Sequence, residues 1–515
     1  MKYWWLQAAL IFSFGILLVT VVKLNLIKGR YYRNLALNNR VTKEIIPAAR
    51  GDIFDKKGRT IANNVDLGGN NKRFYPYGAA TANITGYLGS VNQVELKNGK
   101  CGRDLQNQSI IGRSGIESVM DCELMGVDGY KLIEVDAMGK NNRDLGQLDA
   151  VKGKNINLSI DAYWQEKIYK ALDGKKAAVI MSEPSTGKII ALVSSPSYDA
   201  NNFNYTYDKE TIKSYLEDTQ NLPMMNRTIA AKYHPGSVFK PIEALGALEE
   251  GMIDGNTLIE DTGVIKIGDY SFNNWLWTKS HTTDGMVNVV KALKRSNDIF
   301  FYKLGESMGV DRINLWATKF GLGSTTGIEL PSEVAGLVPD DQWKRNNKNE
   351  RWYLGDTYHL AIGQGDLTVT PLQINQGTNI VASRGQKCKM SILKDKKVEC
   401  SEVKAKAKNW DLVIEGMKEA CNSGGTAWPL FNFKTEVACK TGTAELGDGS
   451  DDTHAWLTAF APADNPEISI TVMVERGGEG SDVAAPLVGD ILKEWFNEPN
   501  TIVPRYPTGY PFKIL

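Results

Sequence analysis

The sequence predicts an α+β protein that is attached to a membrane by one N-terminal transmembrane helix. Three observations lead to this fold class. An apolar, uncharged segment lies near the N-terminus, and a region of short strands and turns follows it. Further along, strand-like runs occur at both ends of a long and mainly helical segment. Strands at both ends with helices between them indicate one antiparallel sheet that carries a helical subdomain.

The N-terminal segment, residues 3–22, reads YWWLQAALIFSFGILLVTVV. As a helix rising about 1.5 Å per residue it spans about 30 Å, the thickness of a hydrocarbon core. The alternative is a cleaved signal peptide, whose apolar region is shorter and ends at a small-x-small site, whereas this run ends in Thr-Val-Val-Lys. We therefore expect a retained anchor. Most nearby positive charges follow the span, and by the positive-inside rule alone the rest of the chain would be cytosolic.

The chain is expected to have four parts. Residues 1–22 are the membrane anchor, and residues 23–154 form a β-rich domain. Residues 155–500 form the α+β domain, and residues 501–515, which contain three prolines, form a C-terminal tail. Such a tail is ordered only where it docks on the domain.

The elements of the α+β domain can be placed in order. Asp161 is a suitable N-cap for a helix that runs to Leu172. The runs AAVIMSE and KIIALVSS follow, joined by Pro-Ser-Thr-Gly, which predicts a hairpin. Helices are expected over most of residues 209–320. The end of the domain holds three strand-like runs and a closing helix, at residues 435–440, 455–461, 468–475 and 482–496.

Composition excludes several function classes. Lys plus Arg and Asp plus Glu both number 60, so the net charge is zero and nucleic acid is not an expected partner. Six cysteines in 515 residues are too few for a disulfide scaffold, and they show no CxxC zinc pattern. Only four histidines occur, with no HExxH spacing, so a histidine-built metal site is not expected.

The first chemical motif is HPGSVFK, which places Ser237 and Lys240 three residues apart. On a helix this spacing puts both side chains on one face. A lysine beside a serine can accept its proton if burial and nearby cations lower the lysine pKa. The Pro-Gly turn before Ser237 also predicts a helix start, where free backbone N–H groups can bind an oxyanion. Alone the motif is weak, because a surface serine with a solvated lysine gives the same pattern.

Two further motifs follow. Ser296 and Asp298 lie in KRSNDIFFYKLG, just before an apolar run typical of a buried helix. The ordinary explanation is a helix N-cap, which Ser and Asp both favour. Lys440, Thr441 and Gly442 lie in CKTGTAE, where a lysine and a threonine hydroxyl on an exposed strand suit a carboxylate and glycine admits a substrate backbone. The ordinary explanation here is a surface strand ending in a turn.

Together, in this order within one α+β domain, the motifs form the S-x-x-K, S-x-N and K-T-G set of serine acyltransferases that act on D-Ala-D-Ala peptides and β-lactams. The chain resembles the class B penicillin-binding proteins, peptidoglycan D,D-transpeptidases, over nearly its whole length. The segments that carry the resemblance are RGDIFDKKGRTIANN, RFYPYG, GRSGIESVMDCELMG, PSTGKIIALVSSPSYDANNF, NRTIAAKYHPGSVFK, GDTYHLAIGQGDLTVTPLQ, VACKTGTAE and HAWLTAFAPADNP.

The resemblance implies catalytic roles for five residues. Ser237 corresponds to the nucleophile that forms the acyl-enzyme, and Lys240 to the base that activates it. Ser296 would relay a proton toward the leaving amine, aided by Lys440. Asp298 stands where most relatives have Asn, and since an ionised carboxylate only accepts hydrogen bonds, we expect it to orient one of the two lysines.

The same resemblance implies the substrate contacts. Thr441 and Thr443 would hold the terminal carboxylate of the peptide, with Gly442 between them allowing close approach. The backbone N–H groups of Ser237 and Thr443 would form the oxyanion hole. No metal or organic cofactor is implied.

The resemblance also implies location and partners. Residues 23–154 would be the pedestal, or dimerisation-like, domain, and the domain after residue 22 would lie outside the cytoplasmic membrane, against the charge bias. Expected partners are stem peptides ending in D-Ala-D-Ala, β-lactams, a membrane glycosyltransferase of the SEDS type, and the membrane itself through residues 3–22. The Ser-x-Asp form and the triplet His454-Ala455-Trp456 favour the elongation-type branch.

Two departures from the family pattern stand out. Cys439 replaces the usual Gly before Lys-Thr-Gly, which adds bulk near the site. Only residues 65–72 separate the segment RGDIFDKKGRTIANN from RFYPYG. Elongation-type relatives insert a much longer head between these two segments, so the partner contacts of that head are in doubt.

The six cysteines fall into three near-neighbour pairs, and an extracytoplasmic location permits these pairs to form disulfides. The pair Cys388/Cys400 is favoured because it spans a plausible hairpin.

Rival functions remain open at this point. A D,D-carboxypeptidase or other hydrolase would use the same acyl-enzyme, and a non-catalytic cell-wall scaffold would not need Ser237, Lys240 and Lys440 intact. A bifunctional synthase needs a glycosyltransferase domain for which about 130 residues leave no room. A β-lactam sensor needs further membrane spans and a zinc protease, and the sequence shows neither.

Overall fold

The computed structural model describes residues 3–31, 33, 41–66, 68, 71–135 and 141–505. The chain divides into two compact units. One consists of Met1–Gly51 with Glu123–Lys154, and the other of Asp52–Cys122 with Asn155–Leu515. Most of the expected C-terminal tail lies outside the described residues.

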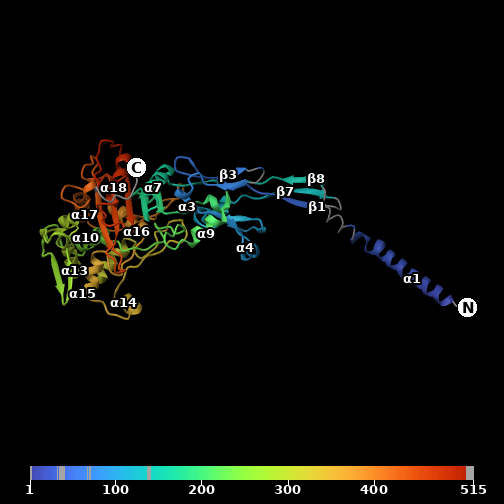
Figure 1. Ribbon diagram of the computed structural model, residues 1–515, viewed down its shortest axis with the longest axis horizontal. Coiled ribbons are helices and arrows are strands. Elements are labelled where there is room, and N and C mark those ends of the chain that lie inside the picture. Colours follow the sequence, from blue (N-terminus) through green and yellow to red (C-terminus); the bar gives the residue numbers. More distant parts are fainter. Residues whose placement is uncertain are drawn as a thin grey trace. The chain divides into compact units, whose positions relative to one another are not determined.

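The first unit contains the apolar helix and a small sheet. Helix α1 (Trp4–Val22) continues into the π-helical turn η1 (Lys23–Ile27), and the whole stretch is long and apolar enough to cross a membrane. It is the dark blue helix in Figure 1. Strands β1 (Val41–Ile46), β7 (Gly129–Val135) and β8 (Asn141–Leu148) form an antiparallel sheet in the order β1-β7-β8.

The turn after Phe54 is built around one buried carboxylate. Asp55 accepts hydrogen bonds from the backbone N–H groups of Lys57 and Arg59, both at 2.8 Å. The turn joins two strands of a four-stranded sheet in the order β4-β3-β2-β9. Those strands and the short elements after them are β2 (Ile53–Phe54), β3 (Thr60–Asp66), β4 (Asn71–Phe74), α3 (Ala79–Thr85), β5 (Leu88–Ser90), α4 (Gln93–Asn98), β6 (Ile110–Gly112), α5 (Gly115–Val119), α6 (Asp121–Leu124) and β9 (Ile156–Asn157).

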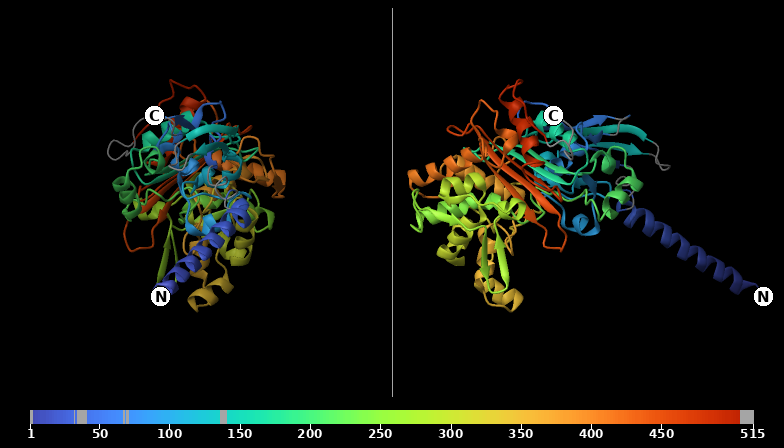
Figure 2. Two further views of the ribbon diagram at one scale, coloured as in Figure 1. Left: turned by 90° about the vertical axis from the view of Figure 1, so that its right-hand side faces the viewer. Right: turned by 60° about the vertical axis from the view of Figure 1, so that its left-hand side comes forward.

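The main sheet has five antiparallel strands in the order β11-β10-β20-β19-β18, as predicted from the two sets of strand-like runs. Strands from distant parts of the chain, drawn teal and orange to red, lie side by side (Figure 2). The strands are β10 (Ala177–Ser182), β11 (Ile189–Ser195), β18 (Ala438–Glu445), β19 (Thr453–Ala461) and β20 (Ile468–Val474). Strand β18 is therefore an edge strand, and it continues through the Lys-Thr-Gly motif.

Helices cover both faces of this sheet. On one face, α7 (Ala162–Leu172), capped by Asp161 as expected, and α18 (Ala484–Trp495) pack on the strands and enclose one apolar core. On the other face, α16 (Pro371–Ala382) lies across β10, β19 and β20 and joins the sheet to the helical subdomain. A second, larger core fills that side.

The helical subdomain lies between β11 and β18 in the sequence. The site depends on three of its elements: the 3₁₀ turn η2 (Gly236–Phe239) with α10 (Lys240–Glu249), and α13 (Asp298–Lys319). Its other elements are α8 (Asn201–Asn204), α9 (Lys209–Glu217), α12 (Val289–Arg295), α14 (Asp341–Lys348), α15 (Leu354–Ala361), β16 (Gln386–Cys388), β17 (Cys400–Glu402), α17 (Ala407–Ala420) and η3 (Trp428–Leu430).

The region expected to be mainly helical also contains a small β-lobe, residues 259–287. The lobe has two short antiparallel ladders, one between β12 and β15 and the other between β13 and β14, with one helix beside them. Its elements are β12 (Ile259–Asp261), β13 (Val264–Ile267), β14 (Tyr270–Asn273), α11 (Trp275–Ser280) and β15 (Gly285–Val287). Runs of three or four residues are too short for sequence periodicity to separate from loops.

All six cysteines are paired, as the near-neighbour spacing allows: Cys101 with Cys122, Cys388 with Cys400, and Cys421 with Cys439. The second bridge joins paired residues of β16 and β17, which form the predicted hairpin.

We expect thiol counting of the purified, denatured, non-reduced protein to find no reactive thiol. Six reactive thiols would contradict all three bridges, and two would identify one open pair after peptide mapping.

Candidate active site

Ser237 lies in η2, directly beside strand β18. The turn requires Gly236, whose φ is +56°, and a Cβ at this residue would lie 2.8 Å from the carbonyl oxygen of Thr443. The N–H of Gly236 donates to the carbonyl of Gly363 at 2.8 Å. Ser237 is thus held at the start of a helix and next to Thr443, and its side chain is only partly buried. Among the described residues, its hydroxyl has no hydrogen-bond partner.

The two motif lysines meet at Ser296. Lys440 Nζ donates to Ser296 Oγ at 2.8 Å. It also donates to the backbone carbonyl of Thr441, the next residue in the strand, at 2.9 Å. Lys240 Nζ donates to Ser296 O at 2.9 Å and lies 3.4 Å from Ser296 Oγ. Both lysines are fully buried. Ser296 Oγ therefore bridges two buried amines that come from different parts of the chain.

The charges of the two lysines are not equivalent. Asp298 Oδ1 lies 2.6 Å from Lys240 Nζ, so the expected contact of this carboxylate with a lysine is with Lys240. Burial lowers the pKa of Lys440 well below its ordinary value, and the positive charge of Lys240 lowers it further, while Asp298 opposes both effects. The surroundings of Lys440 therefore favour its neutral form.

A tight turn aims Ser296 between the lysines. Ser296 has φ +54° and ends α12, and Asn297 caps α13 by accepting from the N–H of Phe300 at 2.9 Å. Asp298 Oδ2 accepts from the N–H of Trp275 at 2.9 Å, which ties the turn to the β-lobe. The cap of α13 is therefore Asn297 and neither Ser296 nor Asp298, whose side chains face the lysines instead.

Sequence reasoning missed a buried carboxylate behind this turn. Asp261 accepts from the side chains of Asn274 and Asn297 and from the N–H of Asp284, each at 2.8 Å. Asp261 belongs to no motif and lies more than thirty residues before Ser296, so no sequence signal could have found it.

The strand motif forms the opposite wall. A Cβ on Gly442 would meet Val238 and Pro235, so only glycine lets the Ser237 turn pack this closely on β18. Thr443 is exposed, whereas the hydroxyl of Thr441 lies 2.6 Å from that of Thr426, a residue that the sequence did not single out. The exposed hydroxyl of Thr443 and the outer edge of β18 suit a peptide carboxylate and backbone.

The bulk of Cys439 does not enter this cleft. Its side chain is fully buried in the core on the α7 and α18 face of the sheet, and it is bonded to Cys421. The sequence-based concern about crowding is therefore wrong, because neighbouring residues of a strand point to opposite faces.

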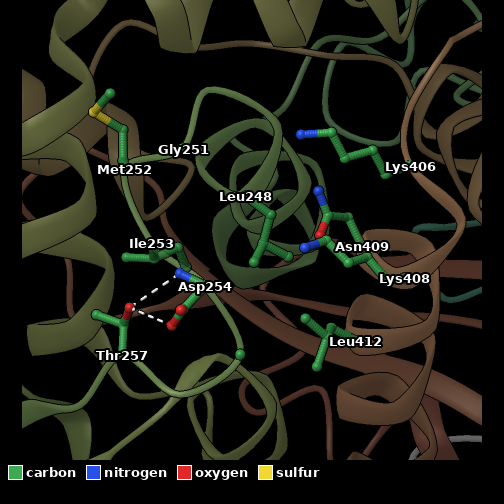
Figure 3. Close-up of a pocket in the computed structure, with 11 residues that line it drawn as sticks. Leu248, Gly251, Met252, Ile253, Asp254, Thr257, Lys406, Lys408, Asn409 and Leu412 are labelled. Carbon is green, nitrogen blue, oxygen red and sulfur yellow. Dashed lines mark hydrogen bonds between the residues drawn. The ribbon is translucent and has the colours of Figure 1, made fainter.

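A separate cavity of about 370 Å³ lies at the far end of α10 (Figure 3). Leu248, Met252 and Leu412 line it, together with Asp254 and Thr257, which are hydrogen-bonded to each other at 2.9 Å. Its lining holds no serine or cysteine nucleophile, and it lies about a helix length from Lys240. This cavity is not part of the site that Ser237 and the lysines define.

Comparisons with known proteins agree with this geometry. The penicillin binding protein transpeptidase domain matches residues 177–493, and the penicillin-binding protein dimerisation domain matches residues 65–158. Peptidoglycan D,D-transpeptidase MrdA of Escherichia coli is 33% identical over 84% of this chain and 71% of its own length. The Acinetobacter baumannii protein of the same name is 35% identical over 82% of this chain, which spans 66% of that relative.

Solved structures show the same likeness. The chain superposes on PBP2 of Pseudomonas aeruginosa with a TM-score of 0.78 and 33% identity, covering 90% of this chain and 98% of that one. PBP2 of Helicobacter pylori, in complex with MreC, gives a TM-score of 0.78 at 27% identity, covering 89% and 98% of the two chains.

The chain belongs to the class B penicillin-binding proteins, enzymes with a serine transpeptidase domain behind a dimerisation domain. Within that class its similarity is to the PBP2, or MrdA, branch. It is thus a peptidoglycan D,D-transpeptidase of cell-wall synthesis, and the apolar helix α1 fits a membrane-anchored member of the class.

Replacing Asp298 with Asn removes the negative charge beside Lys240 and keeps one acceptor oxygen. We expect penicillin acylation to stay within about tenfold of wild type, about 1.4 kcal/mol of barrier, because loss of the neighbouring negative charge favours the base role that the resemblance implies for Lys240. Peptide cross-linking should fall further, since the carboxylate also holds a cation in place for the incoming peptide. The acylation rate and the amount of cross-linked product are measured for both proteins. Equal losses in the two assays would contradict the expectation that Asp298 matters more for cross-linking than for acylation.

Replacing Lys440 with Met tests its lowered pKa. Between that lowered value and 10.5, the ordinary value, the unfolded chain binds the Lys440 proton and the native protein does not. Because the unfolded state then binds more protons, wild-type stability should rise with pH relative to Lys440→Met, by at most about 1.4 kcal/mol per pH unit. Urea unfolding of both proteins at several pH values below 10.5 measures the difference. A difference that is constant across this range would show that native Lys440 keeps its proton.

Proposed function

We propose that Ser237 is the nucleophile and that the two buried lysines and Ser296 move its proton. The observation that supports this most directly is the position of Ser296 Oγ, 2.8 Å from one lysine amine and 3.4 Å from the other. A hydroxyl both donates and accepts, so it can pass a proton between the two amines.

The proposed acylation step uses each group once. Lys240, on the same helix face as Ser237, takes the Ser237 proton while giving one of its own to Ser296, whose proton passes to the neutral Lys440. Ser237 Oγ bonds to the carbonyl carbon of the penultimate D-Ala. The C–N bond to the terminal D-Ala then breaks, and Lys440 returns a proton through Ser296 to the leaving amine. Lys240 begins and ends the step as a cation beside Asp298.

The β18 edge holds the substrate in this proposal. The hydroxyls of Thr441 and Thr443 bind the terminal carboxylate, and the N–H groups of Ser237 and Thr443 bind the oxyanion, which is where such donors act most strongly. Gly442 keeps the strand close to the Ser237 turn. The acyl-enzyme is then released by the amine of a neighbouring stem peptide, which makes the cross-link.

Location and partners extend this proposal. The substrate lies outside the cytoplasmic membrane, so we place both units after α1 on that side, with Trp4–Val22 as the single span. A SEDS-type glycosyltransferase would supply the glycan strands. The Helicobacter pylori relative is known in complex with MreC, and we expect a comparable contact here to be reduced in area, because only residues 65–72 replace the long head.

We expect Ser237→Ala to abolish covalent penicillin binding without unfolding the protein, because the side chain is partly exposed and its hydroxyl makes no hydrogen bond within the described residues. Mass spectrometry of drug-treated wild type should place the adduct on the peptide that contains Ser237. Circular dichroism of the variant checks the fold. An adduct on another serine, or labelling of the variant, would show that a different residue is the nucleophile.

A further inference from the structure

A loop beside the substrate strand carries a threonine that the mechanism does not use. Residues 421–427 connect the end of α17 to η3, and α17 packs on β18. Within this loop, the hydroxyl of Thr426 lies 2.6 Å from the hydroxyl of Thr441. Thr426 is partly exposed, and Thr441 is 7% exposed. The contact therefore lies at the margin of the core, at a residue that is proposed to hold the substrate.

The position of Thr441 is fixed except for the direction of its hydroxyl proton. Thr441 and Thr443 alternate with Gly442, so they lie on one face of β18. β18 is the last strand of the main sheet, so a peptide along its outer edge can reach hydroxyls of that face. Lys440 Nζ donates to the carbonyl of Thr441 at 2.9 Å and holds its backbone. The O–H bond of a threonine can still rotate, and its direction is set by its hydrogen-bond partners.

The backbone of the loop holds Thr426 in place. The residues on both sides of it donate through their N–H groups, Gly425 to the carbonyl of Asn422 at 2.8 Å and Ala427 to the carbonyl of Ala420 at 3.0 Å. Position 425 requires glycine, because a Cβ there would lie 2.3 Å from the carbonyl oxygen of Ala420. The hydroxyl of Thr426 is therefore presented from a tightly folded turn.

Two further contacts tie the loop to both sides of the site. Cys421, at the start of the loop, is bonded to Cys439 in β18. Arg295 Nη1 donates to the carbonyl of Gly424 at 2.8 Å, and Arg295 directly precedes Ser296 in the chain. The loop is thus fixed to the substrate strand and to the turn at Ser296.

The number of protons in the pair decides which hydroxyl must donate when substrate binds. Each hydroxyl has one proton and can also accept, whereas an ionised carboxylate only accepts. If Thr441 donates to Thr426, its proton is used and only lone pairs face the carboxylate. If Thr426 donates instead, the proton of Thr441 stays free for the carboxylate. A hydroxyl that accepts a hydrogen bond is also polarised into a stronger donor.

We propose that Thr426 is a positioning residue for substrate recognition, whose hydroxyl donates to Thr441 Oγ1 and directs the Thr441 proton toward the terminal carboxylate of the donor peptide. The inference rests on the proposed role of Thr441 as a ligand of that carboxylate. Selectivity for donors with a free terminal carboxylate then depends on a residue that does not itself touch the substrate.

The test compares two thioester donors with the same acyl-D-alanyl group, one whose leaving group ends in a carboxylate and one whose leaving group ends in a carboxamide. Thiol release by the full-length protein gives kcat and KM for each donor. We expect Thr426→Val, which removes the hydroxyl and keeps the shape, to lower kcat/KM for the carboxylate donor about fivefold, as for the loss of one hydrogen bond. The loss should lie mainly in KM, and the carboxamide donor should be unaffected. Thr426→Ser, which keeps the hydroxyl, should behave as wild type.

Thr378 offers a matched control, because its hydroxyl also lies 2.6 Å from another threonine hydroxyl, that of Thr458, but inside the core. Thr378→Val should leave the ratio of the two kcat/KM values as it is in wild type. Penicillin labelling of Ser237 in each variant shows that the site is folded. If Thr426→Val is not labelled, Thr426→Ala takes its place and should give the same loss on the carboxylate donor.

Equal losses on the two donors in the Thr426 variants, or a Thr426→Ser protein that does not keep the wild-type ratio, would overturn the inference. Thr441→Val separates this outcome from failure of the proposed function. If Thr441→Val loses the preference for the carboxylate donor while Thr426→Val keeps it, only the inference is overturned. If Thr441→Val keeps the preference, the proposed role of Thr441 is wrong and the inference is overturned with it.

Discussion

The buried pair of Lys240 and Asp298 is the interaction on which the rest of the site depends. An ammonium group placed in a protein core is strongly destabilising unless a carboxylate and hydrogen bonds compensate it. Lys240 has one carboxylate contact, at 2.6 Å, one backbone carbonyl, and the ring of Phe301 with its centroid 5.1 Å away. Glu243, on the next turn of α10, does not share this task, because burial raises its pKa well above the ordinary value and favours its neutral form.

The second lysine is placed under the opposite constraint. Once Lys240 and Asp298 form an ion pair, a further charge on Lys440 would be an uncompensated buried cation, and its pKa falls accordingly. Burial beside another cation thus favours the neutral form of Lys440. Ser296 Oγ thus lies between two buried amines whose surroundings differ in charge.

Much of this arrangement could be predicted from the sequence, and the part that could not has a physical reason. The apolar anchor, the Asp161 cap and the five strands of the main sheet follow from periodicity and turn chemistry, which are local. The motifs give Ser237, Lys240, Ser296 and Lys440 because their spacing within each motif is also local. Which lysine Asp298 would contact depends on three-dimensional packing, and both outcomes were open until the fold brought the turn at Ser296 against α10.

The β-lobe shows how residues that no motif contains support the carboxylate of Asp298. Asp298 accepts from the backbone of Trp275, and the Asp298 N–H donates to Asn274 Oδ1 at 3.1 Å. Asn274 and Asn297 are both held by Asp261. A chain of buried hydrogen bonds thus runs from the lobe to the carboxylate and then to Lys240, so the orientation of Asp298 is set from both of its oxygens. A side chain held at both oxygens keeps its position, which is why this short lobe belongs to the site as much as the helix that carries Ser237.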